Sequence, residues 1–251
     1  MSWLYDAHIH LSDKFYASNI QSILDGMQEM KIKACCVSVD YSNSIETLNL
    51  AQQSDLILPF IGIHPERATD NLQLMIQEIE DNFKQIAGIG EIGLDPTYSN
   101  SDDDLKNQLK VFEALLGVAE KFNKPVSIHS RKSLDKILEI MTSYNTKHSL
   151  LHWFDGSKKQ LKKAMDMDFF VSYGPVTVYA NDKQSLMSYT REDKILIETD
   201  GPVSFSRCFE MKSAQIGFLP SVVFCASKIL KKHYIDVVKL VEKNSESFLQ
   251  I

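Results

Sequence analysis

Short apolar runs, rich in β-branched residues, alternate along the chain with longer amphipathic segments. The runs recur at residues 4–9, 33–39, 57–63, 86–92, 125–129, 148–152, 168–172 and 195–199. Apolar residues at helical spacing mark the longer segments, as in 20–30, 72–80, 104–122 and 135–141. Strands that alternate with helices are typical of parallel βαβ units.

Eight such units within 251 residues predict a (β/α)8 barrel, or TIM barrel, that forms a single α/β domain over residues 1–251. The tail, at about 213–251, is predicted to form one or two closing helices. A doubly wound sheet is the alternative fold. It is disfavoured because no glycine-rich phosphate loop follows the first apolar run.

The composition is that of an ordinary globular protein, with 44% hydrophobic and 24% charged residues. No apolar run approaches the roughly 20 residues of a membrane span, and the first ten residues do not resemble a signal peptide. We therefore expect a soluble cytoplasmic protein with no membrane partner. The four cysteines show no CxxC spacing, which predicts buried, reduced thiols.

The net charge is −6, from 27 basic and 33 acidic residues, and no basic run stands out. Proteins that grip duplex nucleic acid by its backbone usually carry a positive face. If the substrate is an anion, something other than surface lysine has to neutralise it.

Histidines and carboxylates gather where the predicted strands end. Five of the seven histidines lie there, and the exceptions are His148 and His233. In barrels of this class, catalytic groups sit at the carboxyl ends of the strands. The segments concerned are DAHIHL with His8 and His10, GIHPE with His64, GEIGLD with Glu91 and Asp95, SIHSR with His129 and Arg131, LHWFDGS with His152, and ETDGP with Glu198 and Asp200.

The chemistry of these side chains favours a metal site. His8 and His10 alternate along a strand and therefore point to the same face. Imidazoles together with carboxylates suit zinc, manganese or similar ions, and their number exceeds what one catalytic zinc needs. Glu91 could bridge two ions about 4 Å apart, which would generate hydroxide and stabilise the oxygens of a phosphodiester. Such ions would also supply the positive charge that the surface lacks.

The motifs DAHIHL, GIHPE, GEIGLD, PVSIHSR, LHWFDGS and ETDGP, in this order, resemble the TatD-type metal-dependent deoxyribonucleases of the amidohydrolase superfamily. The resemblance runs from residue 6 to about residue 202. It implies hydrolysis of phosphodiester bonds in DNA, most often as a 3′–5′ exonuclease on single strands. It also implies two divalent metal ions (Zn, Mg or Mn), held by His8, His10, Glu91, His129, His152 and Asp200.

The chain departs from the family pattern at several positions. Trp153 and Asp155 stand where the family usually has Cys and Ser or Thr. Pro96 and Thr97 replace an aromatic pair, and Gly201 stands where Cys or a similar residue is common. The implied ligands are all present, so these changes bear on the identity of the substrate.

Further candidates have two interpretations each. His64 contacts a substrate phosphate or forms a hydrogen bond within its loop. Arg131 binds a phosphate or forms an ion pair with Asp95 or Glu198. Asp95 is predicted to orient a ligand histidine, and Glu198 to brace the barrel. The aromatic residues 153–154 stack on bases or pack beside the site.

In the predicted mechanism a hydroxide attacks phosphorus, Glu91 holds both ions, and Asp200 is the catalytic residue that takes the proton. The alternative enzyme is an amidohydrolase acting on a lactone, a cyclic amide or a small phosphoester. Many of those relatives carry a carboxylated lysine where Glu91 stands, which favours the nuclease. The third possibility, a non-catalytic interaction protein, would be expected to have lost ligands. DNA is thus the expected partner, and no obligate protein partner is implied.

Overall fold

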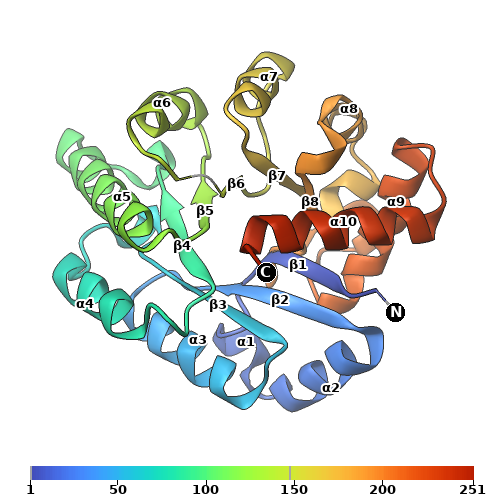
Figure 1. The fold of residues 1–251 in the computed structure, drawn as a ribbon, viewed down its shortest axis with the longest axis horizontal. Coiled ribbons are helices and arrows are strands. Elements are labelled where there is room, and N and C mark those ends of the chain that lie inside the picture. Colours follow the sequence, from blue (N-terminus) through green and yellow to red (C-terminus); the bar gives the residue numbers. More distant parts are fainter. Residues whose placement is uncertain (1, 147) are drawn as a thin grey trace.

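The computed structural model describes residues 2–146 and 148–251 and shows eight parallel strands around a barrel (Figure 1). The strands neighbour one another in sequence order from first to last, which confirms the predicted (β/α)8 fold. They are β1 (Leu4–Ile9), β2 (Ile32–Val37), β3 (Ile57–Ile61), β4 (Gly88–Gly93), β5 (Val126–His129), β6 (Ser149–Leu151), β7 (Phe170–Tyr173) and β8 (Ile195–Ile197). Several, namely β2, β3, β6 and β8, end one or two residues before the apolar runs do, because the last residues of those runs lie beyond the strand ladder.

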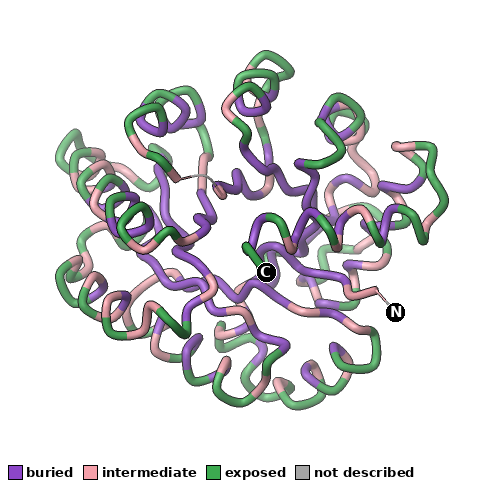
Figure 2. Tube along the Cα trace, in the orientation of Figure 1, coloured by how far each residue is buried: buried purple, intermediate pink, exposed green. Residues whose placement is uncertain are grey.

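Helices surround the strands and turn their apolar sides inward (Figures 1 and 2). They are α1 (Lys14–Ala17), α2 (Ile20–Met30), α3 (Tyr41–Gln53), α4 (Leu72–Asn82), α5 (Asp102–Phe122), α6 (Leu134–Ile140), α7 (Lys158–Asp166), α8 (Asn181–Tyr189), α9 (Leu219–Ile229) and α10 (Tyr234–Leu249). The last two are the closing helices expected in the tail. Between β8 and α9, β9 (Ser204–Phe205) and β10 (Lys212–Ser213) form a short antiparallel hairpin.

Capping residues explain where the longest helix begins and ends. Ser101 accepts a hydrogen bond from the backbone N–H of Asp104, and three aspartates occupy the first turn of α5. Both features stabilise a helix N-terminus. The helix ends at Asn123, which adopts the left-handed conformation that asparagine tolerates better than most residues. Helix α5 therefore starts two residues before its apolar pattern does.

An aromatic cluster fills the amino-terminal end of the barrel. Phe248 of α10 stacks on Phe60 at 5.9 Å and lies edge-to-face with Phe170 at 5.6 Å, between ring centroids. All three side chains are almost fully buried. Helix α10 lies across this end in Figure 1. The chain thus closes the end of the barrel opposite the strand tips that carry the histidines.

Hydrogen bonds at the end of β8 join the first and last strands of the barrel. The buried carboxylate of Asp6 accepts from the backbone N–H of Thr199 at 3.0 Å and from its hydroxyl at 2.5 Å. The backbone N–H of Asp200 donates to the carbonyl of His8 at 2.9 Å. Burial raises the pKa of Asp6 to about 7. These hydrogen bonds hold Asp200 beside His8, at the carboxyl end of the barrel.

Two further predictions concern cysteines and membranes. All four cysteines are free, as expected; Cys35 and Cys36 are buried, but Cys208 is exposed and Cys225 is half-buried. The prediction of burial was wrong for Cys208 because it lies in the hairpin loop. Over the described ranges, no helix has the length and apolar character needed to cross a bilayer.

Candidate metal centre

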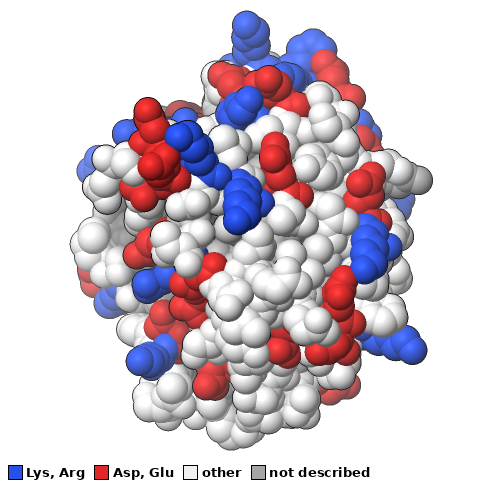
Figure 3. Space-filling model, turned by 90° about the vertical axis from the view of Figure 1, so that its left-hand side faces the viewer, with Lys and Arg blue, Asp and Glu red and all other residues white. Residues whose placement is uncertain are grey.

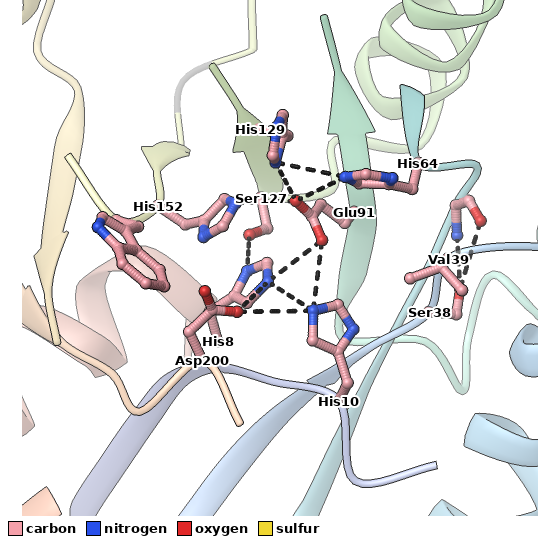
Figure 4. Close-up of polar contacts among 12 residues, drawn as sticks. His8, His10, Ser38, Val39, His64, Glu91, Ser127, His129, His152 and Asp200 are labelled. Carbon is pink, nitrogen blue, oxygen red and sulfur yellow. Dashed lines mark hydrogen bonds and ion pairs between the residues drawn. The ribbon is translucent and has the colours of Figure 1, made fainter. Parts of the chain in front are cut away.

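The six implied ligands converge at the carboxyl ends of β1, β4, β5, β6 and β8, with Glu91 in the middle (Figure 4). Oε1 of Glu91 lies 2.7 Å from Nδ1 of His129 and 2.8 Å from Nε2 of His152. Glu91 is 2% exposed. One carboxylate oxygen thus faces two imidazoles that come from neighbouring strands.

The second oxygen of Glu91 faces the histidine pair of the first strand. Oε2 lies 3.4 Å from Nε2 of His8 and 3.5 Å from Nε2 of His10. Oδ1 of Asp200 lies 3.7 and 3.6 Å from the same two nitrogens. The two carboxylates therefore lie on either side of the His8–His10 pair, and Glu91 is within 3.5 Å of a nitrogen of each of the four imidazoles.

Neighbouring side chains fix the orientation of these imidazoles. Nδ1 of His8 lies 2.8 Å from Oγ of the buried Ser127, and the ring stacks on His152 at 3.7 Å. Nε2 of His129 lies 2.9 Å from Oδ2 of Asp95, so the predicted contact of Asp95 with a ligand histidine is confirmed. Ser127 was not predicted; its place two residues before His129, on the same strand face, is the signal that could have identified it.

The structure explains two of the residues that depart from the family pattern, Thr97 and Gly201. Thr97 donates hydrogen bonds from its backbone N–H and its hydroxyl to Oδ1 of Asp95, at 2.8 and 2.6 Å. At Gly201 a Cβ atom would lie 2.0 Å from Oη of the buried Tyr16. That hydroxyl donates to the carbonyl of Ala214 at 2.6 Å. Glycine at 201 therefore leaves room for a tyrosine that anchors the segment after β8.

Glu198 braces the barrel, as predicted. Its carboxylate accepts from the hydroxyl of Ser172 at 2.5 Å and from the backbone N–H of Trp153 at 2.7 Å. Burial, with the nearby charge of Asp200, raises the pKa of Glu198 well above its usual range. Glu198 thus links β7 and β8 to the loop that follows β6.

His64 lies beside the cluster, against His129 and Glu91. Its Nε2 is 3.4 Å from Nδ1 of His129 and 3.6 Å from Oε1 of Glu91. Its Nδ1 accepts the backbone N–H of Glu66 at 3.2 Å, which is the predicted hydrogen bond within the loop. A neutral imidazole whose Nδ1 accepts carries its proton on Nε2. His64 therefore offers an N–H donor toward the cluster.

A cleft of about 520 Å³ opens over the cluster. Arg131 lines it, and its side chain is exposed. Among the described residues, Arg131 forms no ion pair with Asp95 or Glu198, whose carboxylates instead contact His129 and Ser172. The structure leaves Arg131 facing the cleft.

The electrostatics of the cluster keep its carboxylates ionised. Burial alone would raise the pKa of Glu91, but the surrounding histidines, His152 foremost, hold it well below the usual range. Burial would likewise raise the pKa of Asp200, but the hydrogen bond from His10 and the other imidazoles lower it. Burial lowers the pKa of His8 to about 4. Burial would also lower the pKa of His129, but the carboxylates of Asp95 and Glu91 raise it to about 9. The site thus presents anionic oxygens beside His8, which is neutral at neutral pH, and His129, which binds a metal only after it loses its second ring proton.

The donor set fits divalent ions. Three groups of side chains place one ligand atom each within 4.8 Å of one another. Neutral imidazoles and carboxylates are the ligands that zinc and manganese accept, and carboxylates also suit magnesium. Glu91 belongs to two of the groups, which suits a bridging role. The groups are His8, His10 and Glu91; His8, His152 and Asp200; and His64, Glu91 and His129.

Solved structures share the whole fold. The YJJV TatD homolog of Escherichia coli k12 superposes with a TM-score of 0.90 at 19% identity, over 99% of this chain and 98% of its own. A TatD family hydrolase from Entamoeba histolytica gives a TM-score of 0.86 at 18% identity, over 98% of each chain. At these identities the likeness shows the fold alone, and both chains share the complete barrel.

Sequence comparison extends this likeness to a family. YabD of Bacillus subtilis (strain 168), an uncharacterized metal-dependent hydrolase, is 24% identical over 256 residues and covers 99% of both chains. The deoxyribonuclease TATDN3 of Homo sapiens is 24% identical over 213 residues, 79% of this chain and 78% of its own length. The family model described as TatD related DNase matches residues 5–250. The resemblance seen in the motifs is therefore confirmed, and the chain belongs to the TatD-related DNase family of hydrolytic enzymes.

Proposed function

We propose that this protein is a metal-dependent deoxyribonuclease that uses two divalent ions to hydrolyse phosphodiester bonds at the end of single-stranded DNA. One observation carries the proposal: Glu91 lies among four inward-facing imidazoles and opposite Asp200, at the base of an open cleft. Membership of the TatD-related DNase family and the human TATDN3 relative support DNA as the substrate.

The ligand roles follow from the contacts. His8, His10, His129 and His152 would hold the ions together with Glu91 and Asp200, and Glu91 would contact both. When bound, such ions activate water near neutral pH and neutralise charge on the phosphate. Asp95 and Ser127 hold the rings of His129 and His8, which fixes the nitrogen that each presents.

The remaining roles belong to the side chains that face the cleft. Asp200 is ionised and lines the cleft, so it takes the proton from the attacking water. His64 donates its Nε2–H to a phosphate oxygen or to Glu91. Arg131 directs its guanidinium to the phosphate, since a planar fork matches phosphate oxygens.

The charge around the cleft suits the end of a single DNA strand better than a DNA duplex. Glu66 and Asp155 line the cleft with Arg131. On the side of the barrel drawn in Figure 3, which is not the face of the cleft, acidic and basic side chains of the described residues are likewise interspersed and form no continuous basic band. Asp155 is paired with the ammonium of Lys183. A long duplex needs a positive face, which Arg131 alone does not supply, whereas a terminal nucleotide needs only the local charge of the site.

A substrate panel tests the proposal. The metal-reconstituted protein would be given labelled single-stranded DNA, duplex DNA and RNA, together with small phosphodiesters, carboxylic esters and lactones. We expect release of mononucleotides from single-stranded DNA at a higher kcat/KM than from any other substrate. Preferential turnover of a lactone or cyclic amide, with no phosphodiester cleaved, would instead identify the amidohydrolase.

A further inference from the structure

One wall of the cleft carries a fixed aromatic ring. Trp153 lines the cleft and stacks on the buried ring of Phe205, with centroids 5.2 Å apart and planes 26° apart. Its backbone has φ +40°, and its N–H donates to Glu198 and, at 3.2 Å, to Ser172. Phe154, the next residue, is 1% exposed and belongs to the core. Only the tryptophan of this pair can therefore meet a ligand.

A second aromatic ring lines the same cleft. Tyr98 follows β4, lines the cleft and is 42% exposed. Its ring lies edge-to-face with His64, with centroids 5.5 Å apart. Figure 4 places His64 and His152 on opposite sides of Glu91. Tyr98 contacts the first of these histidines and Trp153 directly follows the second, so the two rings flank the cluster.

A single cation lies between the two rings. Strands β4, β5 and β6 are neighbours, and the segments after them carry Tyr98, Arg131 and Trp153 in that order. Among the described residues that line the cleft, Arg131 is the only lysine or arginine. Around the rim of the cleft, an aromatic ring, a cation and a second aromatic ring thus follow one another on three neighbouring strands.

We propose that Trp153 and Tyr98 are two stacking positions for the nucleobases on either side of the reacting phosphate. This inference rests on the proposed function and narrows its substrate to a dinucleotide unit of an unpaired strand. Aromatic side chains bind single strands by stacking on exposed base faces. In a duplex those faces stack on each other and are covered. Arg131 and the metal centre would then hold the phosphate between the two bases.

Tryptophan fluorescence tests this inference without relying on catalysis. The chain has two tryptophans, and Trp3 lies just before β1, at the other end of the barrel. The W3F variant therefore leaves Trp153 as the sole reporter. An oligothymidylate should quench its emission, whereas an abasic oligonucleotide of equal length should not, in protein with and without added metal. Equal quenching by both, or by neither, would overturn the inference.

Steady-state kinetics on the same two oligonucleotides separate stacking from the hydrolytic step. Trp153→Ala and Tyr98→Ala should each raise KM for oligothymidylate by about 5- to 150-fold, the range for one stacked base, and leave kcat nearly unchanged. Both should leave KM for the abasic oligonucleotide unaltered. Trp153→Phe should restore most of the loss. Tyr189→Ala, which removes an exposed ring on α8, is the matched control.

The two proposals can fail separately. Robust cleavage of DNA with equal KM for both oligonucleotides would overturn the stacking positions and leave the nuclease standing. Selective quenching without cleavage of any nucleic acid would support the stacking positions and overturn the nuclease.

Discussion

The two ends of this barrel differ in their side chains: one end is apolar, and the other carries carboxylates and imidazoles. At the amino-terminal end, Phe60, Phe170 and Phe248 bury one another and present no charge. At the carboxyl-terminal end, Glu91 and Asp200 are 2% and 5% exposed and face imidazoles. Apolar burial favours folding, whereas burial of carboxylates costs free energy unless partners compensate. The comparison teaches that one end holds the fold together and the other is organised for binding at the expense of stability.

A layer of buried polar groups separates the two ends. Ser127 contacts His8, Ser172 contacts Glu198, and Asp6 contacts Thr199. In these contacts the buried polar groups next to the cluster satisfy one another's hydrogen bonds. The imidazole nitrogens and the carboxylates of the cluster therefore remain directed at one another. This layer of buried polar groups thus orients the side chains at the carboxyl-terminal end of the barrel.

The largest expected effect lies at the apolar end. Phe248→Ala should lower the free energy of unfolding by about 3–5 kcal/mol, because the ring leaves a cavity that its neighbours only partly fill. The activity of each folded molecule should be unchanged. Chemical denaturation measures the first quantity, and kcat of the folded fraction the second. The matched control, Phe224→Ala, removes an exposed ring and should change stability little.

Loss of kcat in Phe248→Ala with stability intact would break the comparison. It would mean that the aromatic cluster supports the chemistry at the far end of the barrel directly.

The next largest effect lies at the carboxyl-terminal end. Asp200→Asn keeps the shape of the side chain and one possible ligand oxygen, but removes the charge and the basic site. We expect kcat to fall by at least about 10²-fold, within the range for loss of general acid–base catalysis. Thermal stability should change little. Metal content is measured on the same sample, and Asp166→Asn, on the exposed side of α7, is the control.

A variant that kept its metal and near-normal activity on every substrate would exclude Asp200 as the proton acceptor. His64 would then be the next residue to test.

The smallest effect belongs to the layer of buried polar groups. Ser127→Ala removes the partner of Nδ1 of His8 and should weaken metal binding by about 10- to 100-fold, as is usual when the partner of a ligand histidine is lost. Titration of metal into the chelated protein gives this affinity. The control is Ser149→Ala in β6, whose hydroxyl donates to the carbonyl and the hydroxyl of Thr146. Equal affinity of the two variants would show that stacking on His152 is enough to orient His8.

The periodicity of the chain was sufficient to predict the barrel, because eight buried strands leave eight apolar runs. It could not give the strand ends. His152 belongs to the 148–152 run and Asp200 directly follows the 195–199 run, but both lie past the last residue that pairs with the neighbouring strand. The convergence of the candidate ligands could be predicted because parallel strands end on one side of a barrel. The position of His64 beside the cluster could not, because it depends on a hydrogen bond with the backbone of Glu66.

Contacts between segments that are far apart in the sequence could not be predicted either. Ser127 supports His8 across 119 residues of sequence; its strand face marks Ser127 as a candidate, but no local pattern pairs it with His8. The same holds for Tyr16 and Gly201, where one residue fills the space that the other leaves. The aromatic pair at 153–154 read as two similar candidates, and only the structure separates a ring in the cleft from a ring in the core.

The most direct test of the account is metal content and DNA hydrolysis measured on one sample. Chelated protein should lose its turnover of single-stranded DNA, and activity should return as added Mn²⁺, Mg²⁺ or Zn²⁺ approaches two ions per chain. Glu91→Gln, which lacks the central carboxylate, should neither bind two ions nor recover activity. Undiminished hydrolysis by protein shown to be free of metal would contradict the account.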